Sequence, residues 1–270
     1  MTLLSVTSIQ GRRDYMEDCY DVFNKEGITI VIVCDGHGGK RAAAETCKSL
    51  PELLFDNVKG TNRVIQTAAQ IRQTIIDWGD KLSNYQSGST LTGFLSKGDT
   101  VYFFNIGDSR TYAPLKGRQY LYELKSTFDK QGVFIDNLNI SFKPTDRFQT
   151  IDHDLKHGEL SRITNAGGVI VGGRLNGILS LSRALGDKDT GKGLSYIPDI
   201  YWTRKSAIAG PILLYTDGLY EPQKSSNSDA FEPDFLYYIA SNFNTNVLVN
   251  YSYSKGSEDN MTAILFDVNL

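Results

Sequence analysis

The chain has 270 residues, of which 40% are hydrophobic and 22% charged, a balance that can bury one sizeable core and predicts a single domain spanning residues 1–270. A net charge of −3 does not favour binding to nucleic acid or to an anionic membrane, and no apolar run is long enough to cross a bilayer. Three cysteines, odd in number and without metal-type spacing, are typical of reduced thiols, so we expect a protein of the cytoplasm or nucleus.

The first strongly predicted strand, residues 30–34, is apolar and β-branched and ends at Asp35, which is followed by Gly36 and His37. An Asp-Gly pair after a strand is a common hairpin signal, so a simple turn is one interpretation. Burying an ionised carboxylate without a partner is unfavourable, so the other interpretation is that Asp35 caps the chain or binds a cation. This stretch alone leaves both open.

Segments with helical spacing lie between some of the strands. Residues 40–57 have helical character, but Pro51 is expected to end one helix and open a second, short one. Apolar residues at i, i+3, i+4 and i+7 predict one long amphipathic helix over residues 61–84. Two shorter helices are predicted at residues 159–166 and 234–243.

An acid next to an apolar strand recurs along the chain. Three further pairs follow the first: residues 101–106 with Asp108, residues 212–216 with Asp217, and residues 261–266 with Asp259. Acids at strand ends can converge at one edge of a sheet, where the backbone is rigid and solvent can enter. This repetition favours a carboxylate cluster for a hard cation over a set of unrelated turns.

The order of elements predicts the fold class. Strands come in long sequential runs and helices in consecutive pairs, which favours antiparallel sheets with helices packed outside over a doubly wound parallel sheet. We therefore expect an α+β fold, a central antiparallel β-sandwich flanked by pairs of α-helices. The long stretch 116–148 could add strands or form a partner surface; our hypothesis is that it serves recognition and that residues 119–143 can be replaced by a short turn.

Six short motifs occur in a fixed order: RDYMED at 13–18, DGHGG at 35–39, GDSR at 107–110, SLSRALGD at 180–187, TDG at 216–218 and EDNMT at 258–262. Each motif is weak alone, but a chance match of all six in order is very improbable. Over residues 13–268 the series resembles the metal-dependent (PPM, or type 2C) serine/threonine protein phosphatases.

The resemblance implies two Mn²⁺ or Mg²⁺ ions in a cleft at one end of the sandwich. Asp35 matches the ligand that bridges both ions, Asp217 and Asp259 match further ligands of one ion, and Glu17 with the carbonyl of Gly36 matches ligands of the other. Hard oxygen donors without clustered Cys or His independently favour Mg²⁺ or Mn²⁺ over zinc. Two ions roughly 3.5–4 Å apart generate hydroxide from a shared water, which attacks phosphoserine or phosphothreonine directly.

The resemblance also assigns groups that contact the substrate. Arg13 matches the phosphate-binding arginine; Arg12 competes for this role, but only Arg13 has the family's four-residue offset to Glu17. His37 matches the general acid that protonates the leaving alkoxide, with capping of the turn or holding a carboxylate as the alternative. Asp18 is expected to orient a metal-bound water without contacting the metal ion itself.

A third, weaker metal site is left open by the sequence. Asp108 matches a position linked to such an ion in some family members, with a structural role in its turn as the alternative. Where the family usually has a further Asp, this chain has Glu221, whose longer side chain can reach a cation with different geometry. Arg183 and Asp187 are expected to brace the segment that leads into the flap over the active site.

Three functions are compatible with the sequence. An active phosphoprotein phosphatase is favoured because every acid that the chemistry needs is present. A pseudophosphatase that only binds would normally lack one of these acids, and a two-metal hydrolase of other phosphoesters would differ in substrate. We expect a phosphoprotein as the partner, no nucleic acid or membrane partner, and a monomer.

Overall fold

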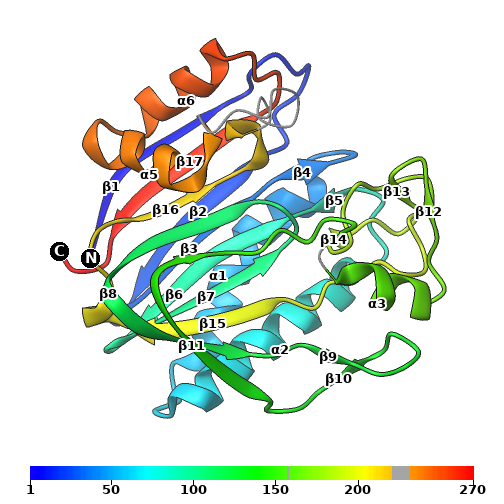
Figure 1. Cartoon of the computed structure of the whole chain (residues 1–270), viewed down its shortest axis with the longest axis horizontal. Helices are drawn as coiled ribbons and strands as arrows, with labels where there is room; N and C mark the ends of the chain where they lie inside the picture. The colour runs from blue at the N-terminus through cyan, green and yellow to red at the C-terminus, as the bar shows by residue number, and fades with distance from the viewer. Residues whose placement is uncertain (157, 221–230) are drawn as a thin grey trace.

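The computed structural model describes residues 1–156, 158–220 and 231–270, which are organised around one ten-stranded antiparallel sheet (Figure 1). The strands follow one another across the sheet in this order: β1 (Thr2–Ile9), β17 (Met261–Asp267), β16 (Ile212–Tyr215), β8 (Arg110–Leu124), β15 (Asp199–Arg204), β7 (Thr100–Ile106), β6 (Leu91–Lys97), β3 (Ile28–Cys34) and β2 (Cys19–Lys25). The tenth strand, β11 (Ile140–Gln149), pairs with β8.

The sheet curls into two facing layers, and the long strand β8 joins them. The start of β8 pairs with β16 and its end pairs with β15. Between the layers lies an apolar core to which Phe94 and Phe103 contribute from one side and Leu214 and Ile264 from the other. The predicted α+β class with an antiparallel sandwich is confirmed, and its two layers are a single hydrogen-bonded sheet.

Strand β3 shows why the sequence forms this arrangement. All seven of its residues are buried. Successive side chains point to opposite faces, so Ile30 and Ile32 pack under the helices while Val31 and Val33 enter the core between the layers. An uninterrupted apolar run is the pattern expected for a strand covered on both faces.

Helices cover both outer faces of the curled sheet (Figure 1). The pair α1 (Arg41–Val58) and α2 (Val64–Leu82) packs on the layer that contains β3, and the pair α5 (Pro233–Asn242) and α6 (Thr245–Ser254) packs on β16 and β17. Helix α6 was not predicted. No helix in the described part of the chain is both long and apolar enough to span a bilayer.

The prediction that Pro51 separates two helices is wrong. Helix α1 runs through Pro51 without interruption, although proline cannot donate the hydrogen bond that this position normally makes. The reason is tertiary packing, because Leu50, Leu54 and Phe55 are buried on the same face of α1 against the sheet. Burial of these side chains outweighs one lost hydrogen bond.

The stretch 116–148 adds strands, so one of the two alternatives left open is correct. It extends β8, forms the short hairpin β9 (Thr127–Phe128) and β10 (Phe134–Ile135), and returns through β11. Leu121 and Leu124 on β8 are buried in the core. The expectation that residues 119–143 can be exchanged for a turn is therefore incompatible with the structure, because that exchange would remove core side chains.

A second, three-stranded sheet lies beside the large one and carries two of the motifs. Its strands are β14 (Leu185–Gly186), β5 (Gly88–Ser89) and β4 (Gly36–His37), with β5 in the middle. The remaining short elements are α3 (Glu159–Asn165), the hairpin β12 (Ile170–Val171) and β13 (Arg174–Leu175), and the 3-10 helices η1 (Lys205–Ala207) and η2 (Asp217–Leu219). The segment from α3 to β14 forms a flap next to the strand ends (Figure 1).

Candidate active site

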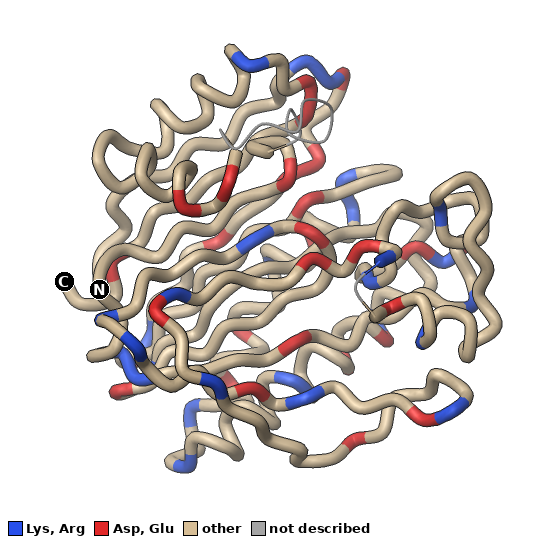
Figure 2. Tube along the Cα trace, in the orientation of Figure 1, with Lys and Arg blue, Asp and Glu red and all other residues tan. Residues whose placement is uncertain are grey.

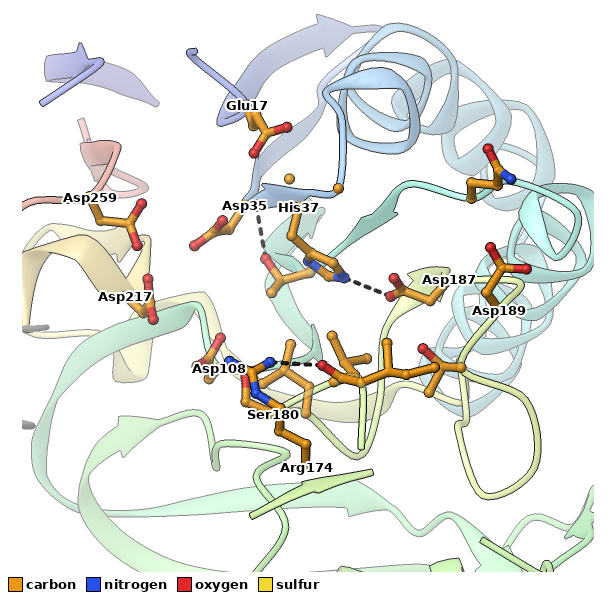
Figure 3. Close-up of a pocket in the computed structure, with 18 of the residues that line it drawn as sticks. Glu17, Asp35, His37, Asp108, Arg174, Ser180, Asp187, Asp189, Asp217 and Asp259 are labelled. Carbon is orange, nitrogen blue, oxygen red and sulfur yellow. Dashed lines mark hydrogen bonds and ion pairs between the residues drawn. The ribbon is translucent and has the colours of Figure 1, made fainter. Parts of the chain in front are cut away.

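A cavity of about 630 Å³ opens where the strand ends meet the flap (Figure 3). Eight of the ten residues predicted to bind metal ions or substrate line it: Arg13, Glu17, Asp35, Gly36, His37, Asp108, Asp217 and Asp259. Figure 3 shows the carboxylates of Glu17, Asp35, Asp108, Asp217 and Asp259 around one half of this space. Acidic positions also gather at this edge of the sheet in the charge-coloured trace (Figure 2). The acids at separate strand ends thus converge, as predicted.

Three of the acids are fixed directly by strands of the large sheet. Asp35 follows β3, and its backbone N–H donates to Thr90 Oγ1 at 2.9 Å while its carbonyl accepts from the Thr90 N–H at 2.9 Å. Asp217 opens η2 two residues after the end of β16, and Asp259 lies two residues before β17. Because neighbouring strands hold these segments, the carboxylates are carried by rigid backbone.

Glu17 is brought to the same cavity by a loop that Asn260 fixes in place. Asn260 Oδ1 accepts from the Glu17 backbone N–H at 2.8 Å, and Asn260 Nδ2 donates to the carbonyls of Gln10 and Tyr15 at 2.7 and 3.0 Å. Glu17 Oε1 in turn accepts from the Gly39 N–H at 2.7 Å. These contacts tie the N-terminal loop both to the start of β17 and to the turn after β4.

The glycine after Asp35 is required by a close approach of two backbones. A Cβ atom at Gly36 would lie 2.5 Å from the carbonyl oxygen of Glu17. Any larger residue at this position would push the Glu17 loop away from Asp35. The Asp-Gly pair therefore allows Glu17 and Asp35 to lie close together, in addition to forming a turn.

The electrostatics of the cavity favour a bound cation. Asp35 is half-buried, and this burial, reinforced by the charges of Asp18, Asp217 and Asp108, holds its pKa well above the usual range. Burial, with the charges of Asp217 and Asp259, also raises the pKa of Asp18 to about 7. Asp18 Oδ2 accepts from Thr216 Oγ1 at 2.9 Å, but Oδ1 is buried without a hydrogen-bond partner among the described residues. Crowded carboxylates are relieved by a cation.

The donor set fits hydrated Mg²⁺ or Mn²⁺. Among the described residues, no three Asp, Glu, His or Cys side chains converge closely enough to hold one ion by themselves. Mg²⁺ does not need such a cage, because it keeps several waters and is bound through one or two carboxylates. Glu17, Asp35, Asp217, Asp259 and the carbonyl of Gly36 supply only oxygen, which suits these hard ions.

Arg13 and Arg12 have different surroundings. Arg13 lines the cavity, and its Nη2 lies 2.6 Å from Asp259 Oδ2, with the side chain 54% exposed. Arg12 forms a longer, exposed ion pair with Glu258 at 3.7 Å and lies over the ring of Tyr253. The structure therefore places Arg13 at the carboxylates, as the motif spacing predicts, and Arg12 outside the cavity.

His37 contacts a carboxylate from a distant motif. Its Nε2 lies 2.7 Å from Asp187 Oδ2, and the two side chains are 29% and 8% exposed. This is the carboxylate contact given above as the alternative to a general acid. A histidine held through one ring nitrogen still has the other for chemistry, so general acid catalysis stays a prediction.

The remaining predicted residues lie in different places. Asp108 faces the cavity from the turn after β7, and its carbonyl accepts from the Tyr220 hydroxyl at 2.7 Å. Asp18 is not among the residues that line the cavity, and Glu221 lies outside the described residues. Arg183 is buried and bonds to Glu159, Asp199 and the carbonyl of Ile197, a bracing role of the kind expected.

Two charged residues of the cavity were missed in the sequence. Arg174 on β13 and Asp189 after β14 both line it, and Arg174 Nη1 donates to the carbonyl of Ile178 at 2.7 Å. The Gly pair at 172–173 indicates a turn before Arg174, but it gives no information about where that turn points. Asp187 was noted as part of a motif, yet its contact with His37 was not foreseen.

The fold and the cavity together define an α+β protein with a cluster of carboxylates around a cavity at one end of an antiparallel sandwich. The family model described as Protein phosphatase 2C matches residues 2–261. Protein phosphatase 1L of Bos taurus is 30% identical over 284 residues, which cover 97% of this chain and 71% of that protein. The chain belongs to the protein phosphatase 2C family.

A second relative is also a protein phosphatase 2C, and a solved structure has a similar fold. Probable protein phosphatase 2C 7 of Oryza sativa subsp. japonica is 27% identical over 273 residues, covering 96% of this chain and 64% of that protein. The crystal structure of serine-threonine phosphatase 2C from Toxoplasma gondii has a TM-score of 0.69 at 17% identity and covers 97% of this chain and 94% of that one. The chain spans 57% to 66% of the length of three plant relatives.

Proposed function

We propose that this chain hydrolyses phosphoserine and phosphothreonine in proteins, with two Mn²⁺ or Mg²⁺ ions at the cavity. The observation that carries the proposal is the convergence of five carboxylates and Arg13, from separate strand ends and loops, on one cavity of about 630 Å³. Membership in the protein phosphatase 2C family supports it. When bound, the ions would lower the pKa of a shared water and offset the charge of the phosphate.

The chain's own residues bind the phosphate and handle the proton. The planar guanidinium of Arg13 can donate two parallel hydrogen bonds to phosphate oxygens, for which it must exchange its present partner, Asp259. His37, on the wall beside Asp35, would give a proton to the departing seryl or threonyl oxygen. We assign Asp18 to the orientation of water behind the carboxylates, through its buried Oδ1.

Substrate profiling tests the proposal. The purified chain is assayed on phosphoserine, phosphothreonine and phosphotyrosine peptides and on small phosphoesters, with Mn²⁺, with Mg²⁺ and with excess EDTA. We expect hydrolysis of the first two peptides that requires a metal ion and stops with the chelator. Full activity in excess EDTA would overturn the two-metal proposal.

The same assay separates the alternative functions. Turnover of small phosphoesters without turnover of the peptides would indicate a small-molecule phosphatase. Binding of phosphopeptides without turnover, at saturating metal, would indicate a pseudophosphatase. A phosphoprotein partner, a monomeric state and a place in the cytoplasm or nucleus are part of the proposal, and light scattering of the purified chain tests the monomer.

A further inference from the structure

The three-stranded sheet β14–β5–β4 brings together the motifs that contain His37 and Asp187. These two residues are 150 positions apart in the sequence, and their side chains are in contact. We propose that Asp187 is a positioning residue for His37. Its carboxylate accepts a hydrogen bond from the Nε2–H of the imidazole, so that Nδ1 is the nitrogen that donates a proton to the leaving oxygen of the substrate. The inference rests on the proposed function and adds to it the partner that orients the general acid.

The register of the small sheet places the two side chains on either side of one glycine. His37 pairs with Gly88 on one side, and Gly186, the neighbour of Asp187, pairs with Gly88 on the other. A Cβ atom at Gly88 would lie 2.0 Å from Asp187 Oδ2 and 2.2 Å from His37 Nε2. The contact therefore occupies the space that any other residue at position 88 would fill.

The backbone at Asp187 is held in place by several hydrogen bonds. Its φ of 55° lies in the left-handed region, which a residue other than glycine adopts only when its surroundings enforce it. The Asp187 N–H donates to the Ser87 carbonyl at 3.3 Å, the Lys188 N–H donates to the Tyr85 carbonyl at 2.9 Å, and the Thr190 N–H donates to Asp187 at 2.9 Å. Conformations of this kind cluster at functional sites, and here the conformation aims the carboxylate at His37.

The contact assigns the hydrogen on the imidazole. An ionised carboxylate can only accept, so Nε2 must carry the hydrogen of the 2.7 Å bond. Nδ1 is then the nitrogen available for transfer, and Figure 3 shows His37 between Asp35 and Asp187. His37 acts in its imidazolium form, with a hydrogen on each ring nitrogen. As the oxygen of water bonds to phosphorus and the P–O bond to the seryl or threonyl oxygen breaks, the Nδ1 proton moves to that oxygen. The product leaves as a neutral alcohol, and His37 becomes neutral with its hydrogen on Nε2.

The chain contains a second His–Asp pair that serves as an internal comparison. His153 accepts from the Gly107 N–H through Nδ1 at 3.0 Å and lies 3.1 Å from Asp199 through Nε2. Both of its ring nitrogens are therefore engaged, and its side chain is only 3% exposed. Such a histidine can only hold structure together. His37, in contrast, lines the cavity and is engaged through Nε2.

Asp187→Asn tests the inference with little change of shape, because Asn tolerates the left-handed region. We expect kcat for a phosphoserine peptide to fall by roughly 10–100-fold, in line with the loss of an outer partner of a functional group. Turnover of p-nitrophenyl phosphate should stay within about threefold, because a good leaving group needs no proton. Combining Asp187→Asn with His37→Gln should lower peptide turnover no further than His37→Gln alone. Mn²⁺ affinity, measured by calorimetry, should be unchanged.

A spectroscopic measurement of the His37 tautomer tests the His37–Asp187 contact independently of any activity assay. The chain has three histidines, so ¹⁵N-histidine labelling gives a short spectrum in which His37→Gln identifies the signal of His37. We expect the Nε2–H tautomer for His37 in the wild type and a mixture of tautomers in Asp187→Asn. Asp187→Gly, which suits the same φ, replaces this variant if it does not fold. Asp77→Asn, at an exposed position of α2, is the matched control and should change nothing.

The outcomes separate the inference from the function on which it rests. A wild-type chain without metal-dependent turnover would refute the proposed function, while the spectrum would still test the His37–Asp187 contact. An Nδ1–H tautomer in the wild type, an unchanged spectrum in Asp187→Asn, equal losses on both substrates, or additive losses in the double variant would overturn the inference.

Discussion

Arg13 Nη2 lies 2.6 Å from Asp259 Oδ2, so the residue expected to bind phosphate is paired with a residue expected to bind a metal ion. Asp259 and a phosphate would compete for the guanidinium of Arg13, and Arg13 and a metal ion would compete for the carboxylate of Asp259. A cation near Asp259 and a cationic Arg13 repel each other, whereas a phosphate attracts both. Substrate and metal should therefore each weaken this ion pair.

Replacing Arg13 should change metal affinity and substrate affinity in opposite directions. In Arg13→Ala, Asp259 loses a neighbouring positive charge, so we expect Mn²⁺ to bind several-fold more tightly by calorimetry. Loss of the phosphate contact should raise KM for a phosphopeptide by about tenfold or more, as expected for a charge-assisted hydrogen bond worth roughly 1.5–3 kcal/mol.

Arg12→Ala is the matched control for this experiment, because Arg12 pairs with Glu258 outside the cavity. In this control, neither the affinity for Mn²⁺ nor KM for the phosphopeptide should change by more than about twofold, as is typical of an exposed ion pair. If Arg12→Ala raised KM and Arg13→Ala did not, the assignment from motif spacing would be reversed.

Asp35→Asn should remove activity while leaving the fold as stable as before or more so. The pKa of Asp35 is raised by burial and by neighbouring acids, so its ionised form destabilises the folded chain at any pH above its unfolded pKa. Neutral Asn removes that repulsion, and urea denaturation at pH 7 in EDTA should show an equal or higher midpoint. Turnover should fall by roughly 10³-fold or more because the charge needed by the metal ions is lost. A loss below about tenfold with metal binding retained would contradict a bridging role for Asp35.

The strand-end acids could be predicted because their signals are local. A short apolar run identifies β3 without any knowledge of its neighbours. Asp35 directly follows its strand, and Asp217 lies two residues after the end of β16. Antiparallel pairing then brings such acids to one edge. The family motifs added their order, and eight of the ten predicted residues line one cavity.

What the sequence did not show depends on contacts between distant segments. The pairing of His37 with Asp187 requires Gly88 between them, and Arg174 reaches the cavity only because the flap folds back over it. The continuity of α1 through Pro51 depends on burial of one helix face, which local propensity does not contain. Sequence patterns within single elements therefore predicted the acids of the cavity, and they did not predict contacts between distant segments.

The pH dependence of stability should reveal the buried network around Glu159. Burial alone would raise the pKa of Glu159, but the charges of Arg183 and Arg162 outweigh it and lower this pKa to about 2. A lowered pKa stabilises the fold above the unfolded value of about 4.5, and the contribution is lost as pH falls from there through about 2. Glu159→Gln should thus reduce the free energy of unfolding at pH 7 by about 2–4 kcal/mol.

The difference between wild type and Glu159→Gln should shrink steadily between pH 4.5 and pH 2, measured by urea denaturation at closely spaced pH values. Glu52→Gln, at an exposed position of α1, should shift stability by less than about 0.5 kcal/mol at any pH. A difference that did not depend on pH would show that packing, and not charge, makes Glu159 matter.

The outer face of β8 and β11 carries exposed aromatic side chains that the core does not require. Phe142 is 65% and Tyr120 56% exposed, and their rings meet edge to face with centroids 5.7 Å apart. On the same strand, Leu121 is buried between the two layers and Leu124 is buried in the cluster under helices α1 and α2. A deletion of residues 119–143 would therefore unfold the chain and say nothing about recognition. Leu124→Ala should alone lower stability by about 2–5 kcal/mol.

A surface variant therefore tests the recognition hypothesis better than a deletion. Tyr120→Ser combined with Phe142→Ser should leave turnover of an aryl phosphate within about twofold, because neither residue lines the cavity. Exposed tyrosines and phenylalanines are frequent anchors in protein interfaces, so kcat/KM for the natural phosphoprotein should fall by about tenfold. Tyr238→Ser, 55% exposed on α5, is the control and should affect neither substrate. Phosphopeptides too short to reach this face should be hydrolysed by the double variant at the wild-type rate. If the double variant also hydrolysed the phosphoprotein at the wild-type rate, the face would take no part in recognition.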